Sequence, residues 1–391
     1  MTLPHYRQEV KEELLHILDY WMAHTVDKER EGFYGRVDVN NKPDLTAAKG
    51  IVVTSRILWT FAAGHQLFPH PKYPEMAKKA YNYLKKYFID EQFGGVYWSV
   101  TAEGVPEQTK KQLYGHAFAL YGLAEYYKIT KEKEVLEMAI AIFRQITAHA
   151  YDKIDGGYIE AFDRNWQNTD DYILSKGENR KSMNTHLHLL EAFTNLYRVW
   201  KDADARFHLQ HSIEMMLQYI IDPKTDRMTL FFTEDWKPTT STISYGHDIE
   251  TSWLLYEAAE VLEDEKIIAT CKKMSISMAK VASDGLAADG GLNYEFEPEK
   301  NHLNTSKQWW PLAEAMVGFL NAYQLTGKVH FLEKSQKTWA FIKNHLIDHK
   351  NGEWFGAVDA NYKITADDKM NFWKGPYHNG RACMEVWRRL G

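Results

Sequence analysis

The chain has few of the features that mark secreted or membrane proteins. Its 391 residues include only two cysteines, Cys271 and Cys383, which excludes a disulfide framework and is typical of a reducing compartment. The N-terminal segment lacks the basic and apolar regions of a signal peptide. No apolar run approaches the ~18 residues that a membrane span needs. These absences predict a soluble, cytoplasmic protein that does not interact with membranes.

Excess positive charge and the signatures of common cofactor sites are also missing. Lysine and arginine number 47 against 53 acidic residues, a net charge of −6, which argues against a nucleic-acid partner. No HExxH, CxxC, P-loop or GxGxxG phrase occurs. His247 and Glu250 resemble half of a di-iron site, but the partner motifs are absent. We therefore expect no metal and no redox cofactor.

Aromatic residues are abundant, at 14% of the chain, and many belong to a repeated Gly/aromatic phrase. Successive copies are 63, 62, 71, 63 and 61 residues apart, and the fourth copy is degenerate. Glycine followed by aromatic and β-branched residues predicts a tight turn that enters a short strand. The anchor residues of the six copies are Gly32, Gly95, Gly157, Met228, Gly291 and Gly352.

Two helical patterns accompany each phrase, a Lys-rich amphipathic one before it and a more apolar one after it. Six such repeats predict twelve helices, with the apolar ones inside. We expect an all-α protein, an (α/α)6 barrel of six helix–hairpin–helix repeats in a single domain, residues 1–391; an open helical solenoid is the alternative. The predicted inner helices are Ile51–Leu67, Tyr114–Tyr127, Thr185–Trp200, His247–Leu262, Trp310–Leu325 and Pro376–Leu390.

Polar and aromatic residues interrupt the inner helices near their starts, so in a closed barrel they converge at one end. Spacings of three or four place pairs such as Glu250 and Trp253 on one helix face. Glu314, on an apolar helix, needs a partner, either Arg56 or a ligand hydroxyl. The predicted site contains Arg56, Tyr114, Asn184, His188, His247, Glu250, Trp253, Trp310, Glu314, Trp373 and His378.

Three histidines are the strongest catalytic candidates, because inner helices of three repeats each place one near their start: His188, His247 and His378. A lone histidine on an apolar helix is usually a core residue, and for His116 and His186 the two interpretations stay open. Tryptophans at a polar funnel, here Trp310 and Trp373, are suited to stacking on flat ligand faces.

At these residues the chain resembles the N-acylglucosamine 2-epimerase superfamily, and within it the cellobiose epimerases. The resemblance runs nearly end to end and is most specific in NTHLHLLEA, SYGHDIETSWLL, WWPLAEA and FWKGPYHNGRA. It implies the same (α/α)6 barrel and a disaccharide substrate. The implied reaction is inversion at C2 of the reducing-end glucose of a β-1,4-linked disaccharide, with no cofactor and no nucleotide activator. A monomer is expected.

The resemblance also implies roles for individual residues. His247 and His378 become the acid/base pair on opposite faces of C2, and His188, helped by Asn184, assists ring opening. Arg56 would stabilise the developing oxyanion. Tyr114, Glu250 and Glu314 would hold sugar hydroxyls and orient the histidines, while Trp310 and Trp373 would stack on the sugar.

Other functions remain possible on the same pattern. A glycoside hydrolase would use Glu250 and Glu314 as its carboxylates. An aldose–ketose isomerase or an N-acylglucosamine or mannose 2-epimerase would use the same histidines, and a helical-repeat binding protein would catalyse nothing.

The stretch 163–181 makes the third interval longer than its neighbours, and we interpret it as a rim loop or lid.

Overall fold

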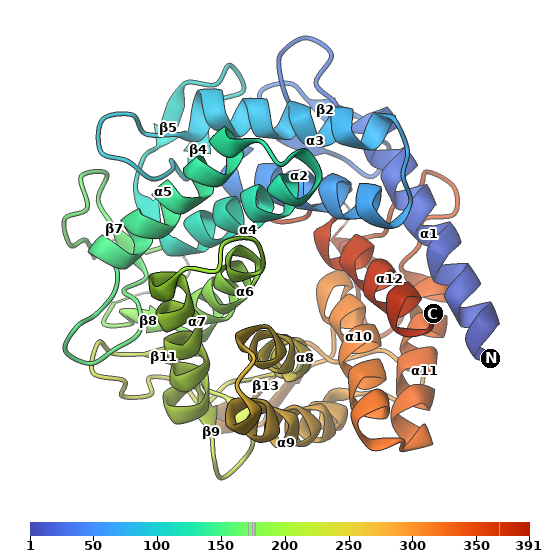
Figure 1. Ribbon diagram of the computed structural model, residues 1–391. Helices are drawn as coiled ribbons and strands as arrows, with labels where there is room; N and C mark the ends of the chain where they lie inside the picture. Colours follow the sequence, from blue (N-terminus) through green and yellow to red (C-terminus); the bar gives the residue numbers. More distant parts are fainter. Residues whose placement is uncertain (171, 174, 176, 367) are drawn as a thin grey trace.

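Two concentric rings of helices form the molecule (Figure 1). The computed structural model describes residues 1–391 except 171, 174, 176 and 367. Outer and inner helices alternate along the chain. The outer ring contains α1 (Leu3–His24), α3 (Lys72–Tyr83), α5 (Lys133–His149), α7 (Ala203–Met215), α9 (Glu265–Ala282) and α11 (Val329–His345). The inner ring contains α2 (Ile51–Leu67), α4 (Leu113–Thr130), α6 (Met183–Val199), α8 (Tyr245–Leu262), α10 (Trp309–Thr326) and α12 (Tyr377–Arg389).

The two rings differ in how much of each helix is buried. In α2 every residue from Ile51 to Gly64 is buried, whereas in α5 burial is confined to one stripe, Val135, Ala139, Ile142, Phe143 and Ile146. A helix that is apolar on all sides needs neighbours on all sides, while an amphipathic helix leaves its charged face in water. The difference in hydrophobic pattern therefore assigns each helix to its ring.

Short helical turns extend or connect these helices. The α-helical part of α3 ends at Tyr83, and a π-helical turn, η1 (Leu84–Phe88), completes the helix. A second π-helical turn, η2 (Met216–Ile220), completes α7 in the same way. Two 3₁₀ turns, η3 (Ser283–Gly285) and η4 (Pro298–Lys300), lie in the fifth repeat.

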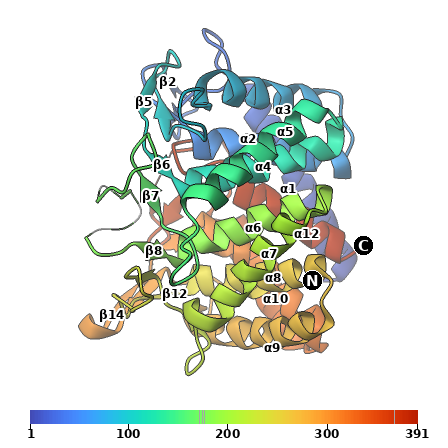
Figure 2. The same ribbon diagram turned by 60° about the vertical axis from the view of Figure 1, so that its left-hand side comes forward.

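Short antiparallel strands gather at one end of the barrel (Figure 2). In chain order they are β1 (Arg36–Val37), β2 (Pro43–Asp44), β3 (Lys49–Gly50), β4 (Ser99–Val100), β5 (Pro106–Gln108), β6 (Lys111–Gln112), β7 (Ala161–Phe162), β8 (Lys181–Ser182), β9 (Ile221–Asp222), β10 (Arg227–Met228), β11 (Phe231–Phe232), β12 (Ile243–Ser244), β13 (Glu295–Glu297), β14 (His302–Asn304), β15 (Lys307–Gln308), β16 (Ala357–Val358) and β17 (Ile364–Ala366). The predicted Gly/aromatic hairpins lie at this end.

Strand pairing connects each repeat to the next one. The strand just before an inner helix pairs with a strand of the following repeat, as in β3–β4, β6–β7, β8–β11, β12–β13 and β15–β16. The ring is closed by a bridge between Val37 of the first repeat and Met370 of the last, and α12 packs against α1 and α2. The predicted closed barrel is therefore confirmed, and the open solenoid is excluded.

A buried aspartate–lysine pair fastens most hairpins. Oδ1 of Asp27 accepts the backbone N–H groups of Glu29 and Arg30, and its Oδ2 lies 2.7 Å from Nζ of Lys49, just before α2. The equivalent pairs are Asp90–Lys111, Asp152–Lys181 and Asp348–Lys369, at 2.7 to 2.8 Å. In the degenerate fourth copy, Asp226 adopts the left-handed conformation (φ 56°) that glycine adopts elsewhere.

The apolar residues of both rings form one hydrophobic core. Within the described part of the chain, no helix is long and apolar enough to cross a bilayer.

Candidate active site

A cavity of about 370 Å³ opens at the hairpin end of the barrel, and every inner helix or its preceding segment contributes to the lining. All predicted site residues except Trp253 and Glu314 line it. The lining residues are Arg56, Tyr114, Asn184, His188, His247, Glu250, Tyr294, Gln308, Trp309, Trp310, Asn371, Trp373 and His378. The volume lies within the usual range for small-molecule sites.

The histidines occupy different positions on their helices. His188 is the sixth residue of α6, His247 the third of α8 and His378 the second of α12. The register expected from the repeat is thus not kept, because the sixth position of α8 and α10 holds Glu250 and Glu314 instead. The three imidazoles therefore reach the same cavity from different helix positions, and not from equivalent positions of the repeat.

Each of the three histidines has its Nδ1 atom anchored. Nδ1 of His188 lies 3.1 Å from Glu191, that of His378 lies 2.7 Å from Glu314, and that of His247 lies 2.7 Å from the Ser244 hydroxyl. A partner at Nδ1 sets the tautomer and the orientation of the ring, so Nε2 is the nitrogen left for a ligand.

Burial keeps all three imidazoles neutral near pH 7. It lowers the pKa of His247 and of His378 to about 3, in the second case against the opposing effect of Glu314. The pKa of His188 is also lowered by burial, with Glu191 opposing the shift. A neutral imidazole is the form that accepts a proton, so the cavity presents bases rather than cations.

Arg56 is held at the cavity wall by contacts other than the predicted one. Its guanidinium donates to the Tyr114 hydroxyl at 2.9 Å and to the carbonyl oxygen of Trp373, and it lies 4.4 Å from the centre of the Phe118 ring. No contact with Glu314 is formed, so that proposed pairing is wrong. The guanidinium instead brings a fixed positive charge to the lining.

Glu314 and Trp253 lie behind the cavity and are absent from its lining, so their predicted contact with the substrate stays a prediction. Oε2 of Glu314 accepts the indole N–H of Trp253 at 3.0 Å, and Oε1 faces His378 and the guanidinium of Arg381. Burial raises the pKa of Glu314, but Arg381 and His378 outweigh it and hold the pKa at about 2. The carboxylate therefore stays ionised and orients His378.

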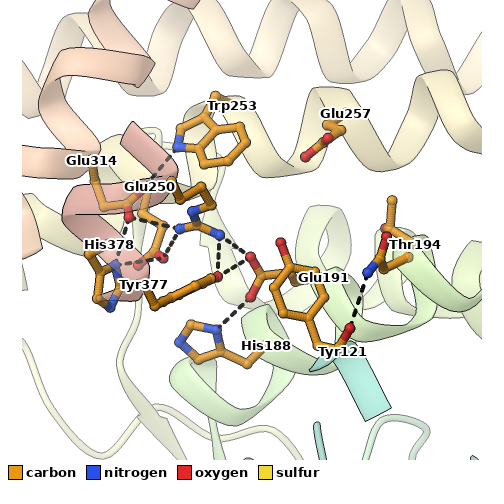
Figure 3. Close-up of polar contacts among 12 residues, drawn as sticks. Tyr121, His188, Glu191, Thr194, Glu250, Trp253, Glu257, Glu314, Tyr377 and His378 are labelled. Carbon is orange, nitrogen blue, oxygen red and sulfur yellow. Dashed lines mark hydrogen bonds and ion pairs between the residues drawn. The ribbon is translucent and has the colours of Figure 1, made fainter. Parts of the chain in front are cut away.

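Glu250 shares Arg381 with Glu314, and Figure 3 shows the two glutamates close together beside His378. Burial and the charge of Glu314 raise the pKa of Glu250 well above its usual range, against the opposing effect of Arg381, which favours the neutral form that can donate a hydrogen bond. Glu250, Glu314 and His378 each offer one potential metal-ligand atom, and these atoms lie within 4.8 Å of one another. The positively charged guanidinium of Arg381 already binds both carboxylates and takes the place that a metal ion would need.

The comparisons with known proteins identify the family. A model of the N-acylglucosamine 2-epimerase (GlcNAc 2-epimerase) family matches residues 32–381. The chain belongs to this family. It is 44% identical to the cellobiose 2-epimerase of Bacteroides fragilis, over 97% of this chain and 98% of that protein. Solved structures of cellobiose 2-epimerases from Bacillus thermoamylovorans (35% identity, covering 99% and 100% of the two chains) and Spirochaeta thermophila (37%, 100% and 97%) both superpose with a TM-score of 0.94.

Two further histidines of this family member are structural. His116 accepts the backbone N–H of Val96 at Nε2, and its Nδ1 contacts the Gln112 carbonyl. His186 makes the same two contacts one repeat later, and Asp248 accepts the corresponding N–H in the repeat after that. With both ring nitrogens used on backbone groups, His116 and His186 hold hairpins and do not line the cavity.

Several residues of the epimerase-family cavity were not predicted. Tyr294, Gln308 and Asn371 complete the lining. Glu191 and Ser244 contact Nδ1 of a histidine from behind, and Arg381 binds Glu191 and Glu314. Glu191 and Arg381 each follow a predicted histidine by three residues, a spacing that places side chains on one helix face and was sufficient to find them. Tyr294 and Asn371 lie outside helices and carry no such signal.

The stretch 163–181 was interpreted as a rim loop or lid. Its first part packs against the second repeat, because Arg164 binds Asp90 at 2.9 Å and the Trp166 indole N–H donates to the Phe93 carbonyl. Residues 171, 174 and 176 of this stretch are outside the described residues. The lid stays a prediction.

Proposed function

We propose that this member of the N-acylglucosamine 2-epimerase family catalyses reversible epimerisation at C2 of the reducing-end glucose of β-1,4-linked disaccharides. Cellobiose would be converted to glucosyl-mannose and lactose to epilactose. The relatives named cellobiose 2-epimerase align over almost the whole chain, which supports the same reaction class here.

One observation of the site carries the proposal. His247 and His378 come from helices on either side of α10, and both rings adjoin Trp310, with centroid distances of 4.6 and 5.8 Å. A sugar stacked on the Trp310 indole would therefore lie between two imidazoles. Inversion at carbon requires a proton acceptor on one face and a donor on the other, and two histidines supply both.

The reaction begins with opening of the sugar ring, because the C2 hydrogen is acidic only beside a carbonyl. In our proposal His188 assists that step and Asn184 holds a hydroxyl; its Oδ1 is buried without a hydrogen-bond partner in the described part of the chain. One of His247 and His378 then takes the C2 proton on Nε2. Because both rings are neutral in the substrate-free site, the other must first take up a proton from solvent before it delivers one to the opposite face.

Charge develops on the enediolate oxygens during this step. Arg56 lines the cavity with a positive charge, which is suited to stabilising the oxyanion. Tyr114 orients Arg56, Glu250 in its neutral form donates to a hydroxyl, and Trp373 offers a second stacking surface. In our revised assignment, Glu314 and Trp253 support His378 instead of touching the substrate.

We propose that no metal takes part. The guanidinium of Arg381 binds both carboxylates of the only three-residue cluster of potential ligands found among the described residues. Dialysis against EDTA, followed by assay in metal-free buffer, should leave kcat unchanged. A loss of activity that added divalent metal restores would contradict this.

The decisive test of function is NMR of cellobiose, lactose and mannose incubated with the protein in D2O. Epimerisation predicts C2-epimeric disaccharides that carry solvent deuterium at C2. A ketose product would instead indicate aldose–ketose isomerisation, conversion of mannose alone would indicate a monosaccharide epimerase, and free galactose from lactose would indicate hydrolysis. If all three sugars stay unchanged, the result would support a sugar-binding protein without catalytic activity. The hydrolase is disfavoured because Glu314 lies behind the cavity.

We further propose that the protein acts as a monomer in the cytoplasm. Both cysteines are buried and unpaired, which is compatible with a reducing compartment. Light scattering coupled to size exclusion, which should report about the 45.6 kDa of one chain, tests the oligomeric state.

A further inference from the structure

One buried arginine links the supports of two cavity histidines. Arg381 lies on α12, three residues after His378, and is 1% exposed. We propose that Arg381 is a positioning residue, which orients the rings of both His188 and His378 by fixing the carboxylates of Glu191 and Glu314.

The first branch of this network reaches His188 across the barrel. Glu191 Oε2 contacts Nδ1 of His188, while its Oε1 accepts hydrogen bonds from Nη1 of Arg381 and from the Tyr377 hydroxyl. Figure 3 shows the Glu191 carboxylate joined by dashed lines to both His188 and Tyr377. Because each carboxylate oxygen has its own partners, the contacts on Oε1 restrict rotation of the carboxylate and so set where Oε2 meets the imidazole.

The second branch reaches His378. Glu314 Oε1 lies 2.7 Å from Nδ1 of His378 and 2.7 Å from Nη2 of Arg381, and Oε2 accepts the Trp253 indole N–H. The same Nη2 lies 3.0 Å from Glu250. Rotation of the Glu314 carboxylate would break at least one charge-assisted hydrogen bond in a buried site, which is costly.

Only a guanidinium fits this place. Its planar fork directs two nitrogens to carboxylates on different helices, and its carbon lies 4.2 Å and 4.7 Å from the ring centres of Tyr377 and Trp253. An ammonium group has no such plane to stack and no rigid fork. The single positive charge also offsets the charges of Glu191 on α6 and Glu314 on α10, which would otherwise repel one another.

The third histidine has its hydrogen-bond partner outside this network, although the charges of His188 and Glu314 act on it. Nδ1 of His247 is held by Ser244, whose hydroxyl belongs to the strand before α8, and Arg381 contacts neither residue. His247 therefore provides an internal reference. A change confined to the network should alter the hydrogen bonding of His188 and His378 and leave the hydrogen bond between His247 and Ser244 in place.

The test measures histidine ¹⁵N shifts, which report the tautomer and hydrogen bonding of each ring, in the full-length protein. We expect R381M to shift the signals of both His188 and His378 and to leave His247 in its wild-type tautomer, with the smallest shift of the three. The matched control is R389M, which removes an arginine from the same helix that also adjoins Trp253, at 5.8 Å, but pairs with Glu385. R389M should leave all three signals in place. Wild-type signals for His188 and His378 in folded R381M would overturn the proposal.

A second pair of variants keeps the test decisive should R381M fold poorly. E191Q and E314Q preserve side-chain volume and weaken one branch each. If Arg381 couples the branches, E191Q shifts His378 as well as His188, and E314Q shifts His188 as well as His378. Shifts confined to the neighbouring histidine in both variants would show two independent pairs and overturn the coupling.

The kinetic consequence rests on the proposed epimerisation. R381K keeps the charge without the fork, so we expect kcat to fall at least tenfold with KM within about threefold, and the pH profile of kcat to move. An R381K enzyme with wild-type kcat and pH profile would contradict a positioning role. If the wild-type protein fails to epimerise any disaccharide, the proposed function fails, yet the substrate-free NMR experiment still decides whether Arg381 couples the rings.

Discussion

Two histidines in one helix turn show how a single contact decides a residue's role. His186 and His188 are two positions apart on α6 and therefore point in different directions. Both ring nitrogens of His186 contact backbone groups, which leaves nothing for a ligand. His188 uses one nitrogen on Glu191 and lines the cavity with the rest of its ring. Residue type and helical pattern are the same for both, so only the tertiary contacts separate them.

The proposed acid/base pair leads to a direct prediction. H247A and H378A should each lower kcat for cellobiose about a thousandfold or more, because a positioned acid or base contributes roughly 10²–10⁴-fold and inversion needs both. KM should change only a few-fold, since the stacking surfaces stay. Steady-state kinetics by product chromatography measures both constants.

A surface histidine provides the control for these variants. His330 is exposed on α11, and H330A should retain wild-type kcat. Turnover within tenfold of wild type in H247A or H378A would refute the assigned roles.

Glu160 is a buried acid that the proposed mechanism does not use. It is fully buried, and Ser182 is the side chain that opposes the effect of burial on its pKa. Burial raises its pKa from 4.5 to about 7. Between about pH 4.5 and 7, the folded protein keeps the Glu160 proton that the unfolded chain releases. The free energy of unfolding therefore falls as the pH rises through this range.

The neutral variant E160Q should remove that loss. At pH 4 its free energy of unfolding should match wild type, and above pH 7 it should exceed wild type by up to about 3 kcal/mol. Urea denaturation across this pH range measures the difference. A wild-type-minus-variant difference that does not vary with pH would contradict the explanation.

At the scale of elements, the buried aspartate–lysine pairs join each hairpin to the start of the next inner helix. Lys49 and Asp27 are both nearly inaccessible, and removing one partner of a buried pair costs about 3–5 kcal/mol because the other charge is left uncompensated. We therefore expect K49M to lower the urea midpoint strongly.

An exposed lysine–glutamate pair near the same hairpin provides the matched control for K49M. Lys86 pairs with Glu31 at 2.9 Å, but both side chains are exposed. K86M should leave the urea midpoint unchanged, because solvent-exposed pairs contribute little. Equal effects of K49M and K86M would show that burial of the pair is not what stabilises the hairpin.

Element boundaries were predictable only approximately. The predicted inner helices begin within two residues of the observed ones; for instance, the third begins at Met183 rather than Thr185. Helical periodicity marks a helix interior, whereas its start depends on the short strand that precedes it, here β8, and on that strand's partner β11 in the next repeat. The π-helical turn η1 has no periodicity of its own and was not predicted.

At the scale of the whole molecule, closure is the property on which the site depends. The cavity takes residues from all six repeats, so it exists only when the last repeat meets the first. We propose that residues 1–391 fold as a single domain for this reason. Figure 1 places the two chain ends together, and Gly391 adjoins Arg7 of α1.

A circular permutant tests closure. Joining the termini through a short Gly/Ser linker and opening the chain at the exposed corner between Lys131 and Glu132 should preserve activity, because a closed ring has no intrinsic first repeat. Opening between Ala313 and Glu314, inside α10, should abolish folding. Circular dichroism and the epimerase assay measure both. An inactive, unfolded Lys131–Glu132 permutant would contradict the prediction.

The sequence by itself determined the number of repeats, their order, the ring to which each helix belongs and which polar residues lie near the inner-helix starts. These are local properties, because hydrophobic period and turn chemistry act within a few residues. Only the tertiary structure decided that Trp253 and Glu314 lie behind the cavity and that Arg381 connects Glu191 to Glu314. Those contacts join residues 190 and 67 positions apart, and no local pattern encodes which buried charges meet when the ring closes.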